Sequence, residues 1–296
     1  MPIAHVTNLY RYPVKSVGGG EVDRIEISNS GVVGDRNWAI IDERESEIRT
    51  ARRWPRLLHL VARYLVPPVA DAYDDTVSPV EISGLDGSSC ASNSPEIDAW
   101  LSRQLERPAH LSPRQPAHRV DHYRLNKGYR PPEEIMEAMD WQEGEIIPDW
   151  SNSDNENIVA MQKYVTVPGT YVDASPVHLL SQNSLDDLAQ TSGLDASHAR
   201  FRPNVVINVP GGKGTPELDW VGRRLALGTT ILRVRAPTIR CVIPGRAQPF
   251  IGLTEQSRMT GVLVRQYQRM LGVYLLVEQP GTVSVGDAVE VIEGES

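Results

Sequence analysis

Short apolar segments separated by turn-forming residues run through most of this chain and limit the folds that it can adopt. Val22–Ile27 follows a run of three glycines at 18–20, and Trp38–Ile41 follows Gly34–Arg36. Further strand-like segments in the second half are Val205–Val209, Ile231–Ala236, Leu275–Glu278 and Val289–Ile292. Internal repeats and an alternation of strands with helices are both missing from the sequence. The pattern predicts a mainly β protein with peripheral helices (α+β), built from small barrels and not from a doubly wound sheet.

Helix signals are few and local. Ser94 can cap a helix that has Pro95 at its first position and that Pro108 ends. Ser181 can cap a second helix, and Gly193 can end it. We also expect a helix from about Ser257 to Leu271, which Gly272 would end, and a short one around Pro132–Met139.

The irregular middle of the chain suggests how it is organised. The stretch 113–172 is rich in Pro, Asn, Asp and Glu, which is typical of a connection between domains or of an insertion over a pocket. We therefore predict an N-terminal β-barrel-like domain over residues 1–125, an irregular connecting segment over 126–172, and a second β-barrel domain over 173–296. Met136, Met139 and Trp141 are expected to pack under this segment.

Charge and composition exclude several classes of function. The formal net charge is −8, which disfavours nonspecific binding to nucleic acid. No apolar run approaches the roughly 20 residues that span a bilayer, and the N-terminus lacks the features of a secretion signal. We expect a cytoplasmic protein that binds neither nucleic acid nor membrane. Two distant cysteines make no disulfide framework, zinc site or iron–sulfur site.

Cys241 is the residue with the most chemical potential. It follows the strand-like segment Ile231–Ala236, is preceded by Arg240, and is followed by Pro244. A sulfur at the edge of a sheet beside a fixed positive charge can be a metal ligand, a nucleophile or a sulfur carrier. Free cysteine is also commonly buried as a small apolar residue, so a structural role remains an alternative.

Three basic motifs accompany this cysteine. Lys15 and Ser16 precede the run of three glycines, and such a loop suits a phosphate. Arg36 stands at the start of a strand, and Arg202 stands just before another, where a guanidinium can bind an anion. An exposed turn, a surface ion pair and an arginine at a strand edge are the respective alternatives.

Taken together, the order and content of these motifs resemble the MOSC proteins. The closer resemblance is to the group with an N-terminal MOSC β-barrel, which contains the mitochondrial amidoxime-reducing component and its bacterial relatives. The resemblance spans Leu9 to Val291, apart from the irregular middle. The motifs that carry it are Pro13–Ser16, Gly34–Arg36, His178–Ser181, Phe201–Asn204, Arg240–Cys241, Pro280–Gly281 and Val285–Asp287.

The resemblance implies a molybdenum cofactor, in which a pterin dithiolene and one cysteine thiolate hold the metal. Cys241 would be the metal ligand. The residues implied to hold the cofactor are Lys15, Ser16, Arg36, Ser181, Arg202, Asn204 and Arg240. Since the whole chain is acidic, an anionic cofactor requires a local basic pocket, and these residues supply one.

The activity implied by the resemblance is reduction of small molecules with N–O or S–O bonds by oxygen-atom transfer. The sequence lacks a dinucleotide fingerprint, and Gly211–Gly214 does not fit a phosphate-binding loop. We therefore expect electrons from a separate donor protein that carries flavin, haem or an iron–sulfur cluster. A sulfur carrier with a persulfide on Cys241, or a carrier of the cofactor without turnover, are the alternative functions.

Other candidate residues have weaker local support. Asp219, in Glu217–Trp220, could handle protons or orient a substrate in catalysis, and a capping or surface role is the alternative. His118 and His122 stand four residues apart without an obvious third metal ligand. Cys90 is expected to be structural or incidental.

Overall fold

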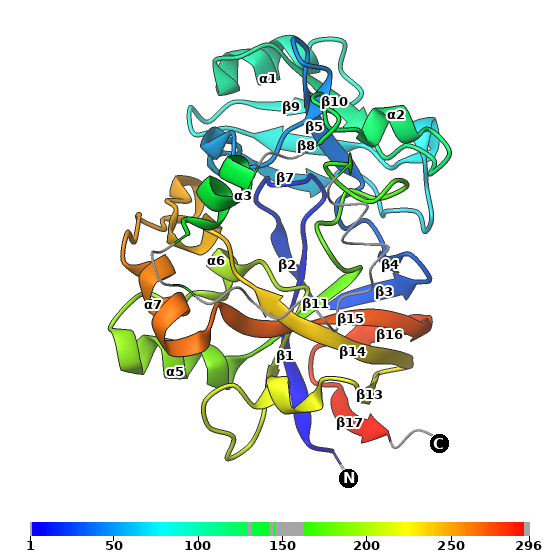
Figure 1. Cartoon of the computed structure of the whole chain (residues 1–296). Coiled ribbons are helices and arrows are strands. Elements are labelled where there is room, and N and C mark those ends of the chain that lie inside the picture. Colours follow the sequence, from blue (N-terminus) through cyan, green and yellow to red (C-terminus); the bar gives the residue numbers. More distant parts are fainter. Residues whose placement is uncertain (1, 130–131, 142–144, 146–162, 293–296) are drawn as a thin grey trace.

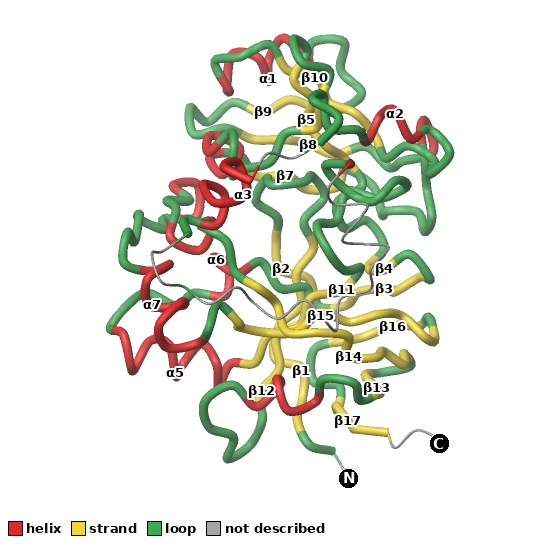
Figure 2. The backbone as a smooth tube through the Cα atoms, viewed as in Figure 1, coloured by secondary structure: helices red, strands yellow, loops and turns green. Residues whose placement is uncertain are grey.

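The computed structural model describes residues 2–129, 132–141, 145 and 163–292, and it shows two β bodies stacked on one another (Figure 1). Both termini of the described chain lie at the end of the lower body that is farthest from the upper one. Figure 2 shows strands in the interior of both bodies and helices mostly at their edges. The prediction of a mainly β fold with peripheral helices is confirmed.

The lower body is a closed barrel, to which the described residues contribute seven strands. Its neighbouring strands are antiparallel except for the parallel pair β11 and β12. In order around the barrel, the strands are β1 (Ala4–Arg11), β12 (Val205–Asn208), β11 (Val177–Ser181), β15 (Met270–Gln279), β14 (Thr230–Ile239), β13 (Arg224–Leu227) and β17 (Ala288–Ile292). Alternate apolar side chains of these strands fill the barrel interior, which accounts for the period-two pattern in the sequence.

A short strand and a small sheet extend the barrel. The strand β2 (Gly20–Val22) pairs with the end of β1. The small sheet consists of β16 (Gly281–Ser284), β3 (Arg24–Ser28) and β4 (Gly31–Val32). The strands β1 to β4, all within the first 32 residues, therefore belong to the lower body, although we grouped them with the N-terminal domain. Strand pairing crosses the predicted domain division because β1 and β3 find their partners in the second half of the chain.

The upper body is built from two small sheets around one apolar core. The core brings together Trp38, Trp54, Leu57 and Trp100, and Ile243 from the second half packs against it. The elements are β5 (Trp38–Asp42), β6 (Glu47–Ile48) and β10 (Ala109–Pro113) in one sheet, β7 (Val61–Tyr64), β8 (Val80–Ser83) and β9 (Ser89–Ala91) in the other, with α1 (Ile97–Leu105), α2 (Val120–Tyr123), η1 (Pro55–His59) and η2 (Asp74–Thr76).

The remaining helices lie beside the barrel or between the two bodies. They are α3 (Pro132–Met139), α5 (Gln182–Ser192), α6 (His198–Phe201), α7 (Met259–Tyr267), η3 (Pro216–Trp220), η4 (Ile243–Gly245) and η5 (Pro249–Ile251). In α5, the Ser181 hydroxyl accepts a hydrogen bond from the backbone N–H of Ser184, and Gly193 ends the helix in the left-handed conformation, both as predicted. Within the described residues, none of the helices is long and apolar enough to cross a bilayer.

The expected helix from Ser257 to Leu271 was too long. It ends at Tyr267, and Gln268 takes the left-handed conformation after it, so that β15 begins at Met270. Gly272 lies within that strand with φ +80°, where a Cβ would stand about 2.8 Å from the carbonyl oxygen of Leu179. The glycine thus permits close approach of two strands instead of ending a helix.

Candidate cofactor site

A cavity of about 360 Å³ opens between the two bodies. Lys15, Ser16, Arg36 and Arg52 line it from the first half of the chain. The second half contributes Asp173, His178, Arg202, Asn204, Arg235, Arg240, Cys241 and Tyr274. Seven of the predicted site residues therefore meet in one place: Lys15, Ser16, Arg36, Arg202, Asn204, Arg240 and Cys241.

Strand pairing in the barrel explains why these distant segments converge. β1 pairs antiparallel with β12, with Leu9 opposite Val205, so the chain that leaves β1 toward Lys15 passes the chain that enters β12 from Arg202. β14 pairs with β15, with Ile239 opposite Met270, and this pairing fixes the position of the residue after Arg240. The cavity thus lies at the end of the barrel where these strands begin or finish.

Cys241 is half-buried and lines the cavity directly after β14. The chain then turns through η4, and the buried guanidinium of Arg200 holds this turn. Arg200 donates to the carbonyl oxygens of Pro244 (3.3 Å) and Thr254 (2.9 Å) and forms an ion pair with Asp195 (2.9 Å). The backbone beside the thiol is therefore anchored in place.

Lys15 is a buried cation in the cavity wall. Its Nζ donates to the carbonyl oxygen of Tyr171 (2.8 Å) and to the carboxylate of Asp173 (2.6 Å). Burial lowers the pKa of Lys15 to about 8, and the attraction of Asp173 opposes that shift. A lysine with this pKa remains mostly charged at neutral pH and can bind an anion.

Arg36 and Arg202 lie against the ring of Tyr12, with guanidinium carbons 5.3 and 4.3 Å from the ring centroid. Arg36 pairs with Asp35, whose other carboxylate oxygen accepts from the backbone N–H of Tyr12 (2.8 Å). Burial, together with repulsion from Arg36, lowers the pKa of Arg202 to about 10. The aromatic ring holds two like charges close together, which favours a bound anion between them.

Backbone conformation at the cavity is strained in three places. Ser16, Arg36 and Arg202 have φ values of 64°, 52° and 55°, in the left-handed region that glycine favours. Each such residue costs about 1–2 kcal/mol relative to a right-handed conformation. Side chains that a fold keeps at strained positions cluster at functional sites, and here all three line the same cavity.

Arg240 is fixed by several acceptors. It donates to the carbonyl oxygens of Leu271 (2.8 Å) and Phe201 (3.1 Å) and to Nε2 of His178 (2.7 Å). Burial, followed by the charge of Arg240, holds the pKa of His178 well below its usual range, so the imidazole is neutral. His178 therefore accepts at Nε2 and donates from Nδ1 to the carbonyl oxygen of Arg202 (3.3 Å). Asn204 belongs to the same set, because its Oδ1 accepts from the backbone N–H of His178 (3.1 Å).

Two predicted site residues lie outside the cavity lining. Ser181 was expected in the cavity wall, but it is fully buried, caps α5 and donates to the carboxylate of Glu217. The side chain of Ser181 points away from the cavity because Ser181 is the last residue of β11 and lies where α5 begins. Asp219 is exposed on η3 and does not line the cavity either. The acidic residue of that segment that turns inward is Glu217, which the two serines Ser181 and Ser184 bind.

Arg52, Asp173 and Tyr274 are among the cavity residues that were not predicted. The Arg52 guanidinium lies 3.8 Å from the carboxylate of Asp173. Asp173, followed by Cys241, outweighs the effect of burial and raises the pKa of Arg52. Lys15 and Arg52 outweigh the effect of burial and lower the pKa of Asp173, which stays ionised. The only available signal was the position of Asp173 at the start of the second domain, and nothing in the sequence around Arg52 set it apart from Arg53.

Among the described residues, no cluster of three or more His, Cys, Asp or Glu side chains is arranged to hold a metal ion by itself. His122 instead bonds to the hydroxyl of Tyr171 at 2.6 Å. The cavity combines one thiol with several buried cations, of which Lys15, Arg202 and Arg240 have pKa values lowered by burial. Such a site suits a bound anion that brings further metal ligands with it. The fold and cavity together define a barrel protein with a cationic site around a single cysteine.

Comparison with known proteins assigns this class to a family. Residues 167–290 match the model of the MOSC domain, and residues 3–108 match that of the MOSC N-terminal beta barrel domain. The chain is therefore a MOSC protein with both domains.

Similar proteins include mitochondrial amidoxime-reducing component 1 of Homo sapiens, which is 26% identical over 97% of this chain and 82% of the relative. Mitochondrial amidoxime reducing component 2 of Rattus norvegicus is 24% identical over 97% of this chain and 83% of its own length. The molybdenum cofactor sulfurase of Homo sapiens is 24% identical over 96% of this chain but only 32% of its own length. Among solved structures, the YuaD protein of Bacillus subtilis is similar with a TM-score of 0.44 and 14% identity, and the match covers 97% of this chain and 94% of that one.

Proposed function

We propose that this protein is a molybdenum-cofactor-dependent oxidoreductase that reduces small molecules with N–O or S–O bonds. The observation that carries the proposal is the convergence of Cys241 with Lys15, Arg36, Arg202 and Arg240 in one cavity. The similarity to the amidoxime-reducing components over nearly the whole chain supports the same reaction class.

The cavity residues divide into two roles toward the cofactor. Lys15, Arg36 and Arg202 would hold its anionic groups, and Arg240, fixed by His178, would complete the positive wall. The Cys241 thiolate would be the protein ligand of the metal. When bound, the cofactor supplies two-electron oxygen-atom transfer, while the protein positions it and sets the charge around it.

The overall reaction converts an N–OH group, two electrons and two protons into an N–H group and water. Asp173 does not supply these protons at neutral pH, because Lys15 and Arg52 keep its pKa low. Its charge instead holds Lys15 and Arg52 in the wall. The electrons would come from a separate donor protein that carries flavin, haem or an iron–sulfur cluster.

Elemental analysis tests the proposal. Protein made in a host that synthesises molybdopterin should contain one molybdenum per chain, as a single thiolate ligand implies. With an artificial electron donor, it should reduce an N-hydroxylated amidine, a hydroxylamine or a sulfoxide. Metal-free protein from that host, or loaded protein without any such activity, would contradict the proposal.

A sulfur carrier is the second candidate, because the molybdenum cofactor sulfurase is also similar over most of this chain. In that role, Cys241 would carry a persulfide. Sulfur released by cyanide from metal-free protein would favour the carrier, whereas molybdenum with no such sulfur favours the oxidoreductase. Bound molybdenum without turnover would indicate a carrier of the cofactor.

A further inference from the structure

The helix α3 lies in the segment between Leu125 and Lys163, and the residues at the two ends of this segment are hydrogen-bonded to one another. The backbone N–H of Leu125 donates to the carbonyl oxygen of Lys163 (3.0 Å), and that of Val165 donates to Tyr123 (2.8 Å). The two ends of this segment therefore lie side by side. α3 follows the first end of the segment and lies between the two bodies, in the part of the chain that the motifs of the family do not cover (Figure 1).

The C-terminal end of α3 is bonded to the chain on both sides of Cys241. The backbone N–H of Val242 donates to the carbonyl oxygen of Ala138 (3.3 Å). The buried guanidinium of Arg269 donates to the carbonyl oxygens of Met139 (2.7 Å) and Arg240 (3.2 Å). A single side chain therefore joins the end of the helix to the residue that precedes the thiol.

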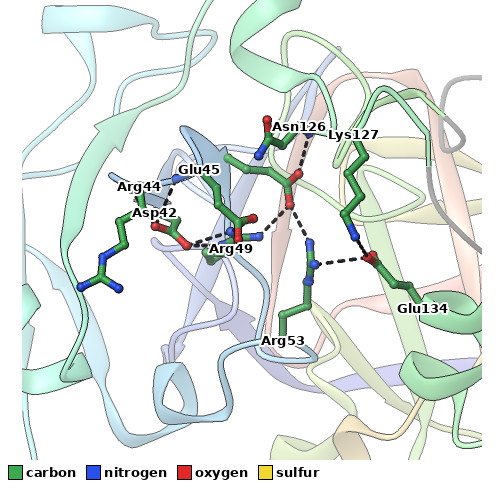
Figure 3. A network of polar contacts seen from close by, with 9 residues as sticks. Asp42, Arg44, Glu45, Arg49, Arg53, Asn126, Lys127 and Glu134 are labelled. Atoms are coloured by element: carbon green, nitrogen blue, oxygen red, sulfur yellow. Dashed lines mark hydrogen bonds and ion pairs between the residues drawn. The ribbon is translucent and has the colours of Figure 1, made fainter.

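The other end of α3 is held by ion pairs to the upper body. Glu134 accepts from Arg53 (3.3 Å) and Lys127 (3.4 Å), and Arg53 also pairs with Glu47 (2.9 Å). Glu47 also accepts from the backbone N–H of Asn126 (2.7 Å), so the start of the segment is bonded to the carboxylate of Glu47 (Figure 3). With both ends attached, α3 has a defined place at the edge of the cavity.

Of the described side chains of α3, that of Met139 reaches the cavity. Met139 is partly buried and lines it, as does Ile243, whereas Met136 on the same helix is 52% exposed and does not line it. We propose that Met139 determines the size of the molecules that reach Cys241. As a substrate-specificity residue it rests on the proposed function, but it limits access to the thiol in the cofactor-free protein as well. An unbranched thioether can form such a wall and still yield to an apolar substituent.

Thiol labelling of the cofactor-free protein tests this proposal. Cys90→Ser leaves Cys241 as the single thiol of the chain. The rates of reaction with N-methylmaleimide and with fluorescein maleimide are measured, and their ratio reports how strongly a bulky reagent is excluded. Met139→Ala should raise the relative rate of the bulky reagent severalfold, and Met139→Phe should lower it. Met136→Ala, the matched control, should leave the ratio unchanged.

A ratio that stays the same in both folded Met139 variants, or that changes equally in Met136→Ala, overturns the proposal. The second readout is kcat/KM of the loaded enzyme for a small and a bulky N-hydroxylated amidine, which Met139→Ala should shift toward the bulky one. If labelling responds but no N–O compound is reduced, the proposed function fails and the role of Met139 stands. If reduction occurs and neither readout responds to Met139, the proposed function stands and this inference fails.

Discussion

Two arginine-rich regions of the molecule differ in how their charges are balanced. In the network around β6, the cations Arg49, Arg53 and Lys127 meet the acids Asp42, Glu45, Glu47 and Glu134 (Figure 3). In the cavity, the cations are Lys15, Arg36, Arg52, Arg202 and Arg240. Among the described residues they share mainly one acid that faces them, Asp173, while Asp35 pairs with Arg36.

The pKa shifts depend on whether an acid lies beside each cation. Acids outweigh burial and raise the pKa of Arg49 in the network, and likewise those of Arg36 and Arg52 in the cavity. Burial lowers the pKa of Arg202 and of Arg240 to about 10. Cations that the fold itself neutralises hold its parts together. Within the described part of the chain, Arg202 and Arg240 are held by carbonyl oxygens instead of ion pairs, so an anion from outside the chain would balance their charge.

Cys241→Ser should have the largest effect on the cavity side of this comparison. Hydroxyl oxygen is a poor substitute for thiolate sulfur toward a soft metal centre, so we expect bound molybdenum to fall strongly and turnover to be lost. Far-UV circular dichroism and the melting temperature should stay close to those of the wild type. Unchanged metal content together with unchanged activity would show that Cys241 is not needed for metal binding or turnover.

The same substitution made in both regions should act very differently on stability. Arg49→Met leaves Asp42 and Glu47 without their shared cation and should lower the free energy of unfolding by about 3–5 kcal/mol. Arg202→Met removes a desolvated charge that Arg36 repels, so we expect a change within about 1 kcal/mol for the cofactor-free protein. Urea unfolding measures both, and equal losses would break the distinction between the two regions. Arg202→Met should at the same time weaken retention of the cofactor.

Anion binding in the cavity should depend on pH through Lys15. Its folded pKa of about 8 lies below the ordinary value of 10.5, so the side chain loses its charge as the pH rises through about 8. The stabilisation that sulfate gives the cofactor-free protein should therefore decline above pH 8, by about 1–2 kcal/mol for a lost charged hydrogen bond. Sulfate does not titrate in this range, and Lys15→Gln should remove the decline.

Without an anion, Lys15 makes the stability of the protein depend on pH in the opposite direction. Between about pH 8 and the ordinary lysine value, the unfolded chain binds more protons at Lys15 than the folded protein does. The free energy of unfolding should gain from this group as the pH rises through that window. Sulfate stabilisation that stays constant from pH 7 to 10 in the wild type would place the anion away from Lys15.

Glu45→Gln should have the smallest effect. Glu45 pairs with Arg49, but its side chain is 48% exposed and Arg49 keeps two buried partners. We expect less than about 1 kcal/mol in urea unfolding, and less at high salt. If Glu45→Gln lowered the free energy of unfolding as much as Glu47→Gln does, burial would not decide how much each acid of the network contributes to stability.

Much of the barrel and its helices could be predicted locally. Ser181 and Gly193 mark the ends of α5 because a cap and a left-handed glycine act over one turn. Leu271 and Gly272 misled the prediction of α7, since the backbone approach that requires this glycine involves Leu179, far away in sequence. Asp219 and Glu217 lie two residues apart with the same charge, and only packing decided which of them turned inward.

By itself, the sequence determined the turn pattern, the helix caps, the charge and the single cysteine behind a strand, because each of these depends on neighbours within a few residues. Tertiary structure alone decided that Lys15, Arg36, Arg202 and Cys241 share a cavity, that Arg52 and Asp173 join them, and that Ser181 does not. The physical reason is that a side chain's surroundings depend on which strands pair. The antiparallel contact of Leu9 with Val205 unites segments that lie almost two hundred residues apart.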